Sequence, residues 1–331
     1  MALKLGCAVW TLMEPDYHAP YEPAIQKVAD AGFEGIELMV DDAEELQTYW
    51  KKEQICKIRE MLSDNHLELI QVCMFQNMVG GLADLRKEKK EQALENIRAV
   101  CRLAKELGTR TVNFTSPYPE EDITVKTTAT LPEYFYLNLP DIVLPGGETR
   151  CVEGWRFDAK FRLYFPEGFC WEEYWENFID SMKRTAEITE EEDVGLRIEN
   201  RYNTMTPHTD SVLRMLKRIE SRRISVTFHT GQAFLQREIL PWAVHRYGKA
   251  ASCVRVCDGD GLACYNLPVG AGITYWEGVL EALKEVGYDG YLSFEWLNDA
   301  DKEEHVRDSI DYLRRRMEKV YGEAVEGYSC V

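Results

Sequence analysis

The chain has 331 residues, of which 45% are hydrophobic, and its formal net charge is -18. This length suits one α/β barrel that carries an insertion, so a second domain is not required. The negative charge repels phosphate backbones and anionic lipid headgroups, which argues against nucleic acid and membrane surfaces as partners. A small neutral molecule is the kind of partner that this charge permits.

The N-terminal sequence MALKLGCAVW has no basic region followed by a long apolar segment, and the chain contains no apolar run long enough to cross a bilayer. We therefore expect neither export nor membrane insertion, and a cytoplasmic location. The 10 cysteines are scattered and include no Cys-x-x-Cys pair. This distribution is typical of reduced thiols in a cytosolic protein.

Short β-rich runs alternate with amphipathic helical stretches along the chain. The runs that we interpret as strands are LKLGCAVW, EGIELMV, LELIQVCMF, RTVNFTS, VGLRIENR, ISVTFHTG, SCVRVCDG and GYLSFEWL. Eight β/α units in succession predict a (β/α)8 TIM barrel, which we expect to occupy residues 1–331 as a single domain. A weak internal repeat agrees, because residues 31–38 and 286–295 each place a glycine at a helix end, then an aromatic–acid–glycine turn and a strand.

The alternation is interrupted once, between the fourth predicted strand and the helix expected near residue 171. Residues 118–169 are rich in aromatic residues and turn formers. So long a connection inside a compact barrel is usually functional. Because it leaves the C-terminal rim of the barrel, we interpret it as a lid or a docking surface. The open alternative is that it only covers hydrophobic surface or packs at a subunit interface.

Strand alternation predicts which side chains point into the barrel. It places Glu199 and His229 inside, at the ends of the fifth and sixth strands. Arg255 and Glu295 take the same position on the seventh and eighth. Because charged residues are rarely buried without partners, these side chains mark a polar site at the end of the barrel where enzymes of this architecture carry out chemistry. The structural alternative is a set of buried ion pairs, Glu199 with Arg255 or Glu295 with Arg197, that only close the barrel interior.

Five segments carry a family resemblance: ADAGFEGIEL, LAKELGTRTVNF, RIEN, FHTGQA and GITYWEGVLEALKEVGYDGYLSFE. Together they resemble the xylose-isomerase-like TIM barrel superfamily, also called the sugar phosphate isomerase/epimerase family. This group includes sugar epimerases, inosose dehydratases, the large subunit of C-glycoside deglycosidases and endonuclease IV. The likeness covers nearly the whole chain apart from residues 118–169.

The resemblance implies a divalent metal held by glutamate, aspartate, histidine and glutamate from strands five to eight. The glutamates match at Glu199 and Glu295, but His229 stands at the aspartate position and Arg255 at the histidine position. A guanidinium cannot ligate a metal. Two outcomes stay open. Either Glu199, His229 and Glu295 bind a manganese-like or magnesium-like ion, or Arg255 lies between the glutamates and itself supplies the positive charge. No nucleotide cofactor is expected.

Paired carboxylates across a sugar-sized cleft predict removal of a proton next to the carbonyl of a keto-sugar, through an enediolate. This is the reaction of sugar isomerases and epimerases. Glu199 and Glu295 would act as base and acid, with Arg255, His229 or a metal as electrophile. Two alternatives stay open: a β-eliminating lyase or deglycosidase that acts on the C- or O-glycoside of a 3-keto-sugar with a partner subunit, and a non-catalytic barrel subunit.

Residues just beyond the strand ends are candidates for contacting substrate hydroxyl groups, namely Arg201, His208, Gln232, Asp258 and Trp296. Trp10 ends the first predicted strand and is a candidate to stack on a sugar ring. The expected ligand is therefore a carbohydrate or a glycoside. We expect the protein to form a homo-oligomer or a complex with a smaller subunit.

Overall fold

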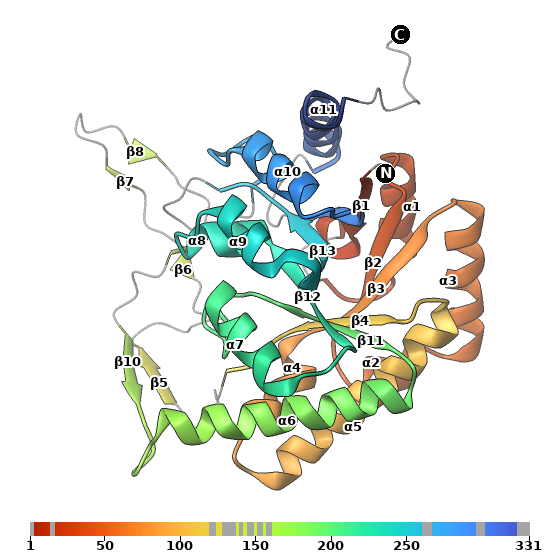
Figure 1. The fold of residues 1–331 in the computed structure, drawn as a ribbon. Coiled ribbons are helices and arrows are strands. Elements are labelled where there is room, and N and C mark those ends of the chain that lie inside the picture. Colours follow the sequence, from red (N-terminus) through yellow and green to blue (C-terminus); the bar gives the residue numbers. More distant parts are fainter. Residues whose placement is uncertain are drawn as a thin grey trace.

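The computed structural model describes residues 3–13, 17–118, 165–259, 267–295 and 302–322, with the backbone of short strands between residues 124 and 164. Eight parallel strands close into a barrel in the order β1-β14-β13-β12-β11-β4-β3-β2 (Figure 1). The predicted (β/α)8 barrel is therefore confirmed, and every predicted strand is present. The barrel strands are β1 (Lys4–Ala8), β2 (Gly35–Val40), β3 (Glu68–Met74), β4 (Thr111–Thr115), β11 (Gly195–Glu199), β12 (Ile224–His229), β13 (Ala251–Val256) and β14 (Tyr291–Phe294).

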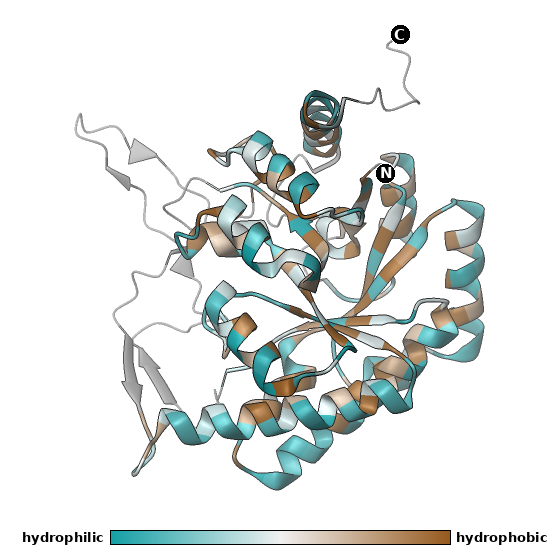
Figure 2. Cartoon of the chain, in the orientation of Figure 1, coloured by the Kyte–Doolittle hydropathy of each residue, from teal (hydrophilic) through white to brown (hydrophobic). Residues whose placement is uncertain are grey.

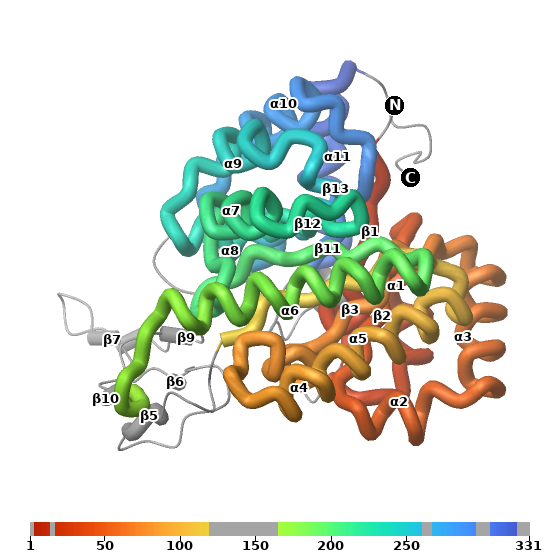
Figure 3. Tube along the Cα trace, turned by 60° about the horizontal axis from the view of Figure 1, so that its bottom comes forward, coloured from red at the N-terminus to blue at the C-terminus, as the bar shows by residue number. Residues whose placement is uncertain are grey.

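Helices surround the ring of strands on its outside, as the views in Figures 1 and 3 show together. The α-helices are α1 (Glu22–Asp30), α2 (Glu45–Thr48), α3 (Lys52–Asp64), α4 (Gln76–Val79), α5 (Lys87–Leu107), α6 (Trp171–Glu191), α7 (Thr209–Ile219), α8 (Thr230–Leu235), α9 (Leu240–Tyr247), α10 (Trp276–Glu285) and α11 (Lys302–Tyr321). Short 3-10 helices are η1 (Val9–Leu12), η2 (Gly80–Ala83) and η3 (Gly248–Ala250). None of the helices in the described part of the chain combines the length and the apolar character that crossing a bilayer requires.

The main hydrophobic core lies between the strands and the helices. Alternate strand residues such as Leu196, Ile198 and Phe228 are fully buried in it. Figure 2 shows the same division, with apolar residues along the strands and polar residues on the outer faces of the helices. Because these outward strand residues are committed to the core, the residues between them must point into the barrel, as the alternation predicted.

The predicted repeat of a helix-ending glycine is present at both places. Gly32 follows α1 with φ 81° and Gly287 follows α10 with φ 71°. Both values lie in the left-handed region, which glycine enters without a Cβ penalty. The two half-units therefore enter their strands, β2 and β14, by the same turn.

The predicted insertion, residues 118–169, lies mostly outside the described residues. Within it the structure gives six short strands: β5 (Thr124–Thr127) paired with β10 (Phe161–Tyr164), β6 (Leu137–Asn138) with β9 (Trp155–Arg156), and β7 (Ile142–Val143) with β8 (Thr149–Arg150). All three pairs are antiparallel. Its role as a lid or a docking surface stays a prediction, as does the single-domain organisation of residues 1–331.

Candidate active site

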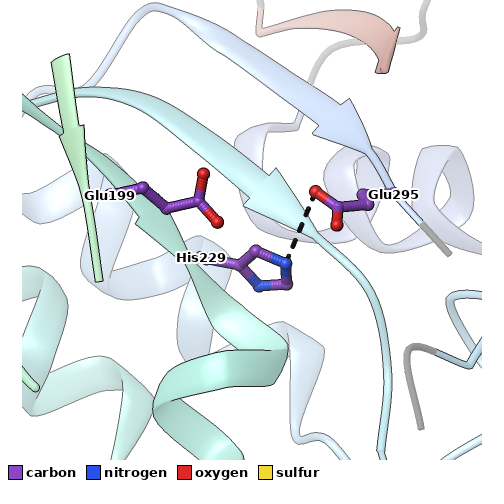
Figure 4. A group of neighbouring side chains, drawn as sticks. All are labelled: Glu199, His229 and Glu295. Atoms are coloured by element: carbon purple, nitrogen blue, oxygen red, sulfur yellow. Dashed lines mark ion pairs between the residues drawn. The ribbon is translucent and has the colours of Figure 1, made fainter. Parts of the chain in front are cut away.

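The structure brings four predicted residues together at the C-terminal ends of neighbouring strands. Glu199 and His229 are the last residues of β11 and β12, Arg255 lies in β13, and Glu295 directly follows β14. All four side chains are less than a tenth exposed. Figure 4 shows Glu199, His229 and Glu295 pointing toward one another from separate strands. Their common burial strengthens every electrostatic interaction among them.

Arg255 is the centre of this cluster. Its Nη1 donates to Glu199 Oε2 at 2.5 Å, and its Nε lies 3.1 Å from Glu295 Oε2. Its Nη2 forms an ion pair with Glu37, which extends from β2 on another side of the ring. The indole of Trp10 covers the guanidinium, with 5.0 Å between Arg255 Cζ and the ring centroid. Three carboxylates and one aromatic ring therefore hold this cation in place.

Glu37 was not predicted as part of the site. It is fully buried, accepts a hydrogen bond from Gln71 Nε2 at 2.5 Å, and lies 3.3 Å from the thiol sulfur of Cys73. One signal in the sequence could have found it. Glu37 is an acidic residue near the middle of the otherwise apolar strand EGIELMV, and a carboxylate in that position needs a buried partner.

The carboxyl groups of the cluster differ in their tendency to ionise. Burial raises the pKa of Glu199 above its ordinary value, and this effect outweighs the opposing charge of Arg255. Burial acts in the same direction on Glu295, but there the charge of Arg255 prevails and lowers its pKa to about 2. The pKa of Glu37 is also lowered, because burial is outweighed by the charge and hydrogen bonds of Arg255. The cluster therefore holds two carboxyl groups, Glu199 and Glu295, whose pKa values are displaced in opposite directions.

The His229 imidazole lies between the start of α8 and Glu295. Its Nδ1 accepts a hydrogen bond from the backbone N–H of Gln232 at 3.3 Å, which caps the N-terminus of α8. A neutral imidazole has one donor and one acceptor nitrogen, so the proton lies on Nε2. That nitrogen is 3.5 Å from Glu295 Oε2. His229 therefore presents an N–H group, not a free lone pair, toward the carboxylates.

Glu199, His229 and Glu295 form a candidate ligand set for a divalent metal. Donor atoms of Glu199, His229 and Glu295 lie within 4.8 Å of one another, so a potential ligand triad exists. However, the Oε2 atoms of both glutamates contact Arg255, and the imidazole nitrogen that faces Glu295 carries a proton. A bound metal ion needs a free lone pair on each of its ligand atoms and no fixed cation beside it. The residues as arranged do not fit a divalent ion.

The alternative pairing of Glu295 with Arg197 is not observed. Arg197 donates instead to Ser252 Oγ at 2.9 Å and to Gln71 Oε1 and the carbonyl oxygen of Ile70, each at 3.2 Å. Arg197 precedes Glu199 by two residues on β11 and so lies farther from the C-terminal strand ends. Glu295 pairs with Arg255 instead. The other alternative pairing, Glu199 with Arg255, is present.

One predicted substrate contact, Asp258, has hydrogen-bond partners within the protein. Asp258 is buried, and its carboxylate accepts from the backbone N–H groups of Gly259, Gly270 and Thr274 and from the indole of Trp276, at 2.9 to 3.0 Å. These bonds fix the described ends of the connection between β13 and α10, so a sugar hydroxyl would have to compete with them.

The other candidates differ in their distance from the cluster. Arg201 follows β11, and its charge helps to lower the pKa of Glu295. Gln232 is buried beside His229, and its Oε1 has no hydrogen-bond partner among the described residues, so it remains a candidate for contact with a ligand. His208 is exposed and caps α7, outside the cluster. Trp296 lies outside the described residues.

The chain is a closed parallel (β/α)8 barrel with a buried cluster of charged residues at the C-terminal ends of its strands. Residues 25–316 match the family model described as xylose isomerase-like TIM barrel, and the chain belongs to this family. The resemblance seen in the sequence is thereby confirmed. Protein MJ1311 of Methanocaldococcus jannaschii is 29% identical over 168 residues, which are 47% of this chain and 56% of that protein. The chain thus spans about half the length of the curated relative that it matches.

Solved structures of similar fold include sugar epimerases. The D-psicose 3-epimerase of Clostridium cellulolyticum H10 has a TM-score of 0.70 at 15% identity, over 95% of this chain and 99% of that chain. The 3-keto-D-glucoside 4-epimerase of E. coli has a TM-score of 0.66 at 14% identity, again over 95% of this chain and 99% of that one. At this level of identity the likeness establishes the fold that these enzymes share.

Proposed function

We propose that the protein is a sugar isomerase or epimerase that removes a proton from the carbon beside the carbonyl group of a keto-sugar. The observation that carries this proposal is the buried pair of carboxyl groups, Glu199 and Glu295, held by one guanidinium and displaced in opposite directions in pKa. Enzymes obtain an acid and a base in one site by shifting the pKa values of two carboxyl groups in opposite directions. Family membership and the epimerase folds support the same class.

The proposed reaction exchanges a proton between the two faces of one carbon. The ionised Glu295 accepts the proton as the carbon–hydrogen bond breaks, and the bonding electrons move onto the carbonyl oxygen to give an enediolate. Glu199, which keeps its proton to higher pH, then donates a proton to the opposite face of the same carbon. In the reverse direction the two groups exchange roles. The overall reaction consumes no proton and needs no redox cofactor.

The negative charge that develops on the enediolate oxygen needs a fixed donor. Arg255 and the Nε2–H group of His229 are the donors that point into the pocket. Both are positioned before the reaction, because Glu37 and Trp10 hold Arg255 and the start of α8 holds His229. A preorganised donor of this kind in a buried site typically contributes more than it would in water.

The proposal is tested by proton exchange in deuterated water. Ketopentoses, ketohexoses and 3-keto-glucosides would be incubated with the purified protein, and loss of the proton beside the carbonyl followed by NMR. We expect exchange in the wild type and a loss of about 100-fold or more in Glu199→Gln and Glu295→Gln. Glu68→Gln is the control, because Glu68 lies at the N-terminal end of β3 and accepts from Lys4 and Tyr291. Full activity in either site variant would refute the mechanism, and release of an aglycone would favour elimination.

A further inference from the structure

We infer that Arg255 is a built-in cation that occupies the place of a divalent metal, so that the pocket excludes metal ions and works without one. The catalytic meaning of this inference rests on the proposed function, but the exclusion of metal does not. Three independent features of the described residues support it.

The first feature is the use of the carboxylate oxygens. Arg255 Nη1 lies 2.5 Å from Glu199 Oε2, and Arg255 Nε lies 3.1 Å from Glu295 Oε2. A dication coordinated between these glutamates would stand next to a permanent positive charge. Arginine cannot remove that repulsion by losing a proton, because its guanidinium stays charged in proteins. Both glutamates therefore already share one cation, which belongs to the chain.

The second feature is the orientation of the His229 imidazole. A histidine that ligates a metal usually donates its other N–H to an oxygen acceptor, which leaves the ligating nitrogen with a free lone pair. Here the other nitrogen, Nδ1, accepts from the backbone of Gln232. In the neutral imidazole this hydrogen bond leaves the proton on Nε2, which lies 3.5 Å from Glu295 Oε2. This is the reverse of the arrangement that a metal requires.

The third feature is the anchoring of Arg255. An arginine held by flexible contacts alone would move aside to admit an ion. Arg255 is only 3% exposed, pairs across the barrel with the fully buried Glu37, and is covered by Trp10. Glu37 is itself held by Gln71. Since Glu37 and Trp10 add no donor to the triad of Glu199, His229 and Glu295, their contacts serve to position the guanidinium.

Binding of Mn²⁺ alone tests the inference directly. The full-length protein would be dialysed against chelator and titrated with Mn²⁺, with free ion measured by electron paramagnetic resonance. We expect no stoichiometric binding by the wild type. Arg255→His should bind one ion, with an affinity about 10-fold or more above any residual affinity of the wild type. Arg255→Lys keeps the charge and should bind no ion. Arg197→His is the matched control, since it places a histidine inside the barrel away from the glutamates.

Each outcome separates the inference from the proposed function. Stoichiometric Mn²⁺ binding by the wild type would overturn the inference, and so would a folded Arg255→His variant that binds no more Mn²⁺ than the wild type. If circular dichroism shows that Arg255→His does not fold, the wild-type titration and the elemental content of the purified protein decide. Metal exclusion without any proton exchange on keto-sugars would contradict the proposed function only. Proton exchange that requires added Mn²⁺ would contradict the inference only.

Discussion

Replacement of Glu37 by glutamine should destabilise the barrel, although Glu37 is not one of the paired glutamates of the proposed reaction. The substitution is nearly isosteric and keeps a carbonyl oxygen that accepts a hydrogen bond. It removes the negative charge that faces the Nη2 of Arg255 and turns an acceptor into an amide donor. The guanidinium, which is almost fully buried, then has two carboxylates instead of three.

The size of the effect follows from the remaining partners. Loss of one partner of a buried ion pair typically costs about 3–5 kcal/mol, because the other charge stays buried. Glu199 and Glu295 still contact Arg255, so we expect the lower end, about 3 kcal/mol. An unfolding entropy of about 2 cal/mol/K per residue gives about 0.7 kcal/mol/K for this chain, so the midpoint temperature should fall by about 4 °C.

Differential scanning calorimetry and urea unfolding would measure the change, with wild type and variant at neutral pH. Glu68→Gln is again the matched control, because its partner Lys4 is about half exposed and an exposed pair is worth at most about 1 kcal/mol. A double-mutant cycle with Arg255→Gln adds a second readout, since removing both charges should cost less than the sum of the single changes. If Glu37→Gln is no more destabilising than the control, and the cycle shows no coupling, the assignment of Glu37 as the anchor of Arg255 is wrong.

Three further predictions concern the same region. Because folding lowers the pKa of Glu295 from 4.5 to about 2, its ionised form stabilises the fold above pH 4.5, and this contribution is lost as the pH falls toward 2. Urea midpoints should therefore decline more steeply across that window in the wild type than in Glu295→Gln; equal slopes would contradict the shift. Asp258→Ala should cost about 3 kcal/mol and expose the loop between β13 and α10 to protease, because four donors lose their acceptor. Trp10→Leu should lose about 1–2 kcal/mol more than Trp10→Phe in thermal unfolding, because only the phenylalanine keeps a ring over Arg255.

The fold was predictable because burial of one side of each strand against the helices produces both the sequence pattern and the packing. Residues such as Leu196 and Phe228 alternate with polar residues, and the helices cover only one side of each strand. The same alternation placed Glu199, His229, Arg255 and Glu295 at the strand ends. Alternation could not predict the distances between side chains on different strands, since it describes each strand separately.

The sequence did not reveal the role of Glu37 or the contacts of Asp258 and Trp10, and the physical reason differs for each. Glu37 lies in a strand whose residues are buried on both sides, so no alternation marks it. Asp258 follows a strand end like a site residue, but the glycine-rich loop after it supplies backbone N–H groups that its carboxylate accepts from. The expected contact of Trp10 with a sugar stays a prediction, and its ring lies over Arg255. These contacts of Asp258 and Trp10 cross the fold, and local sequence does not encode them.

The ion pair between Arg255 and Glu37 also bears on how the chain folds. The two residues are 218 positions apart, and they belong to opposite halves of the chain. Contacts of such high sequence separation form late, after shorter loops have closed. A half-barrel of β11 to β14 would already hold Arg255 with Glu199 and Glu295, whereas Glu37 on β2 would lack its cation. Neutralisation of the buried Glu37 carboxylate should therefore accompany closure of the ring.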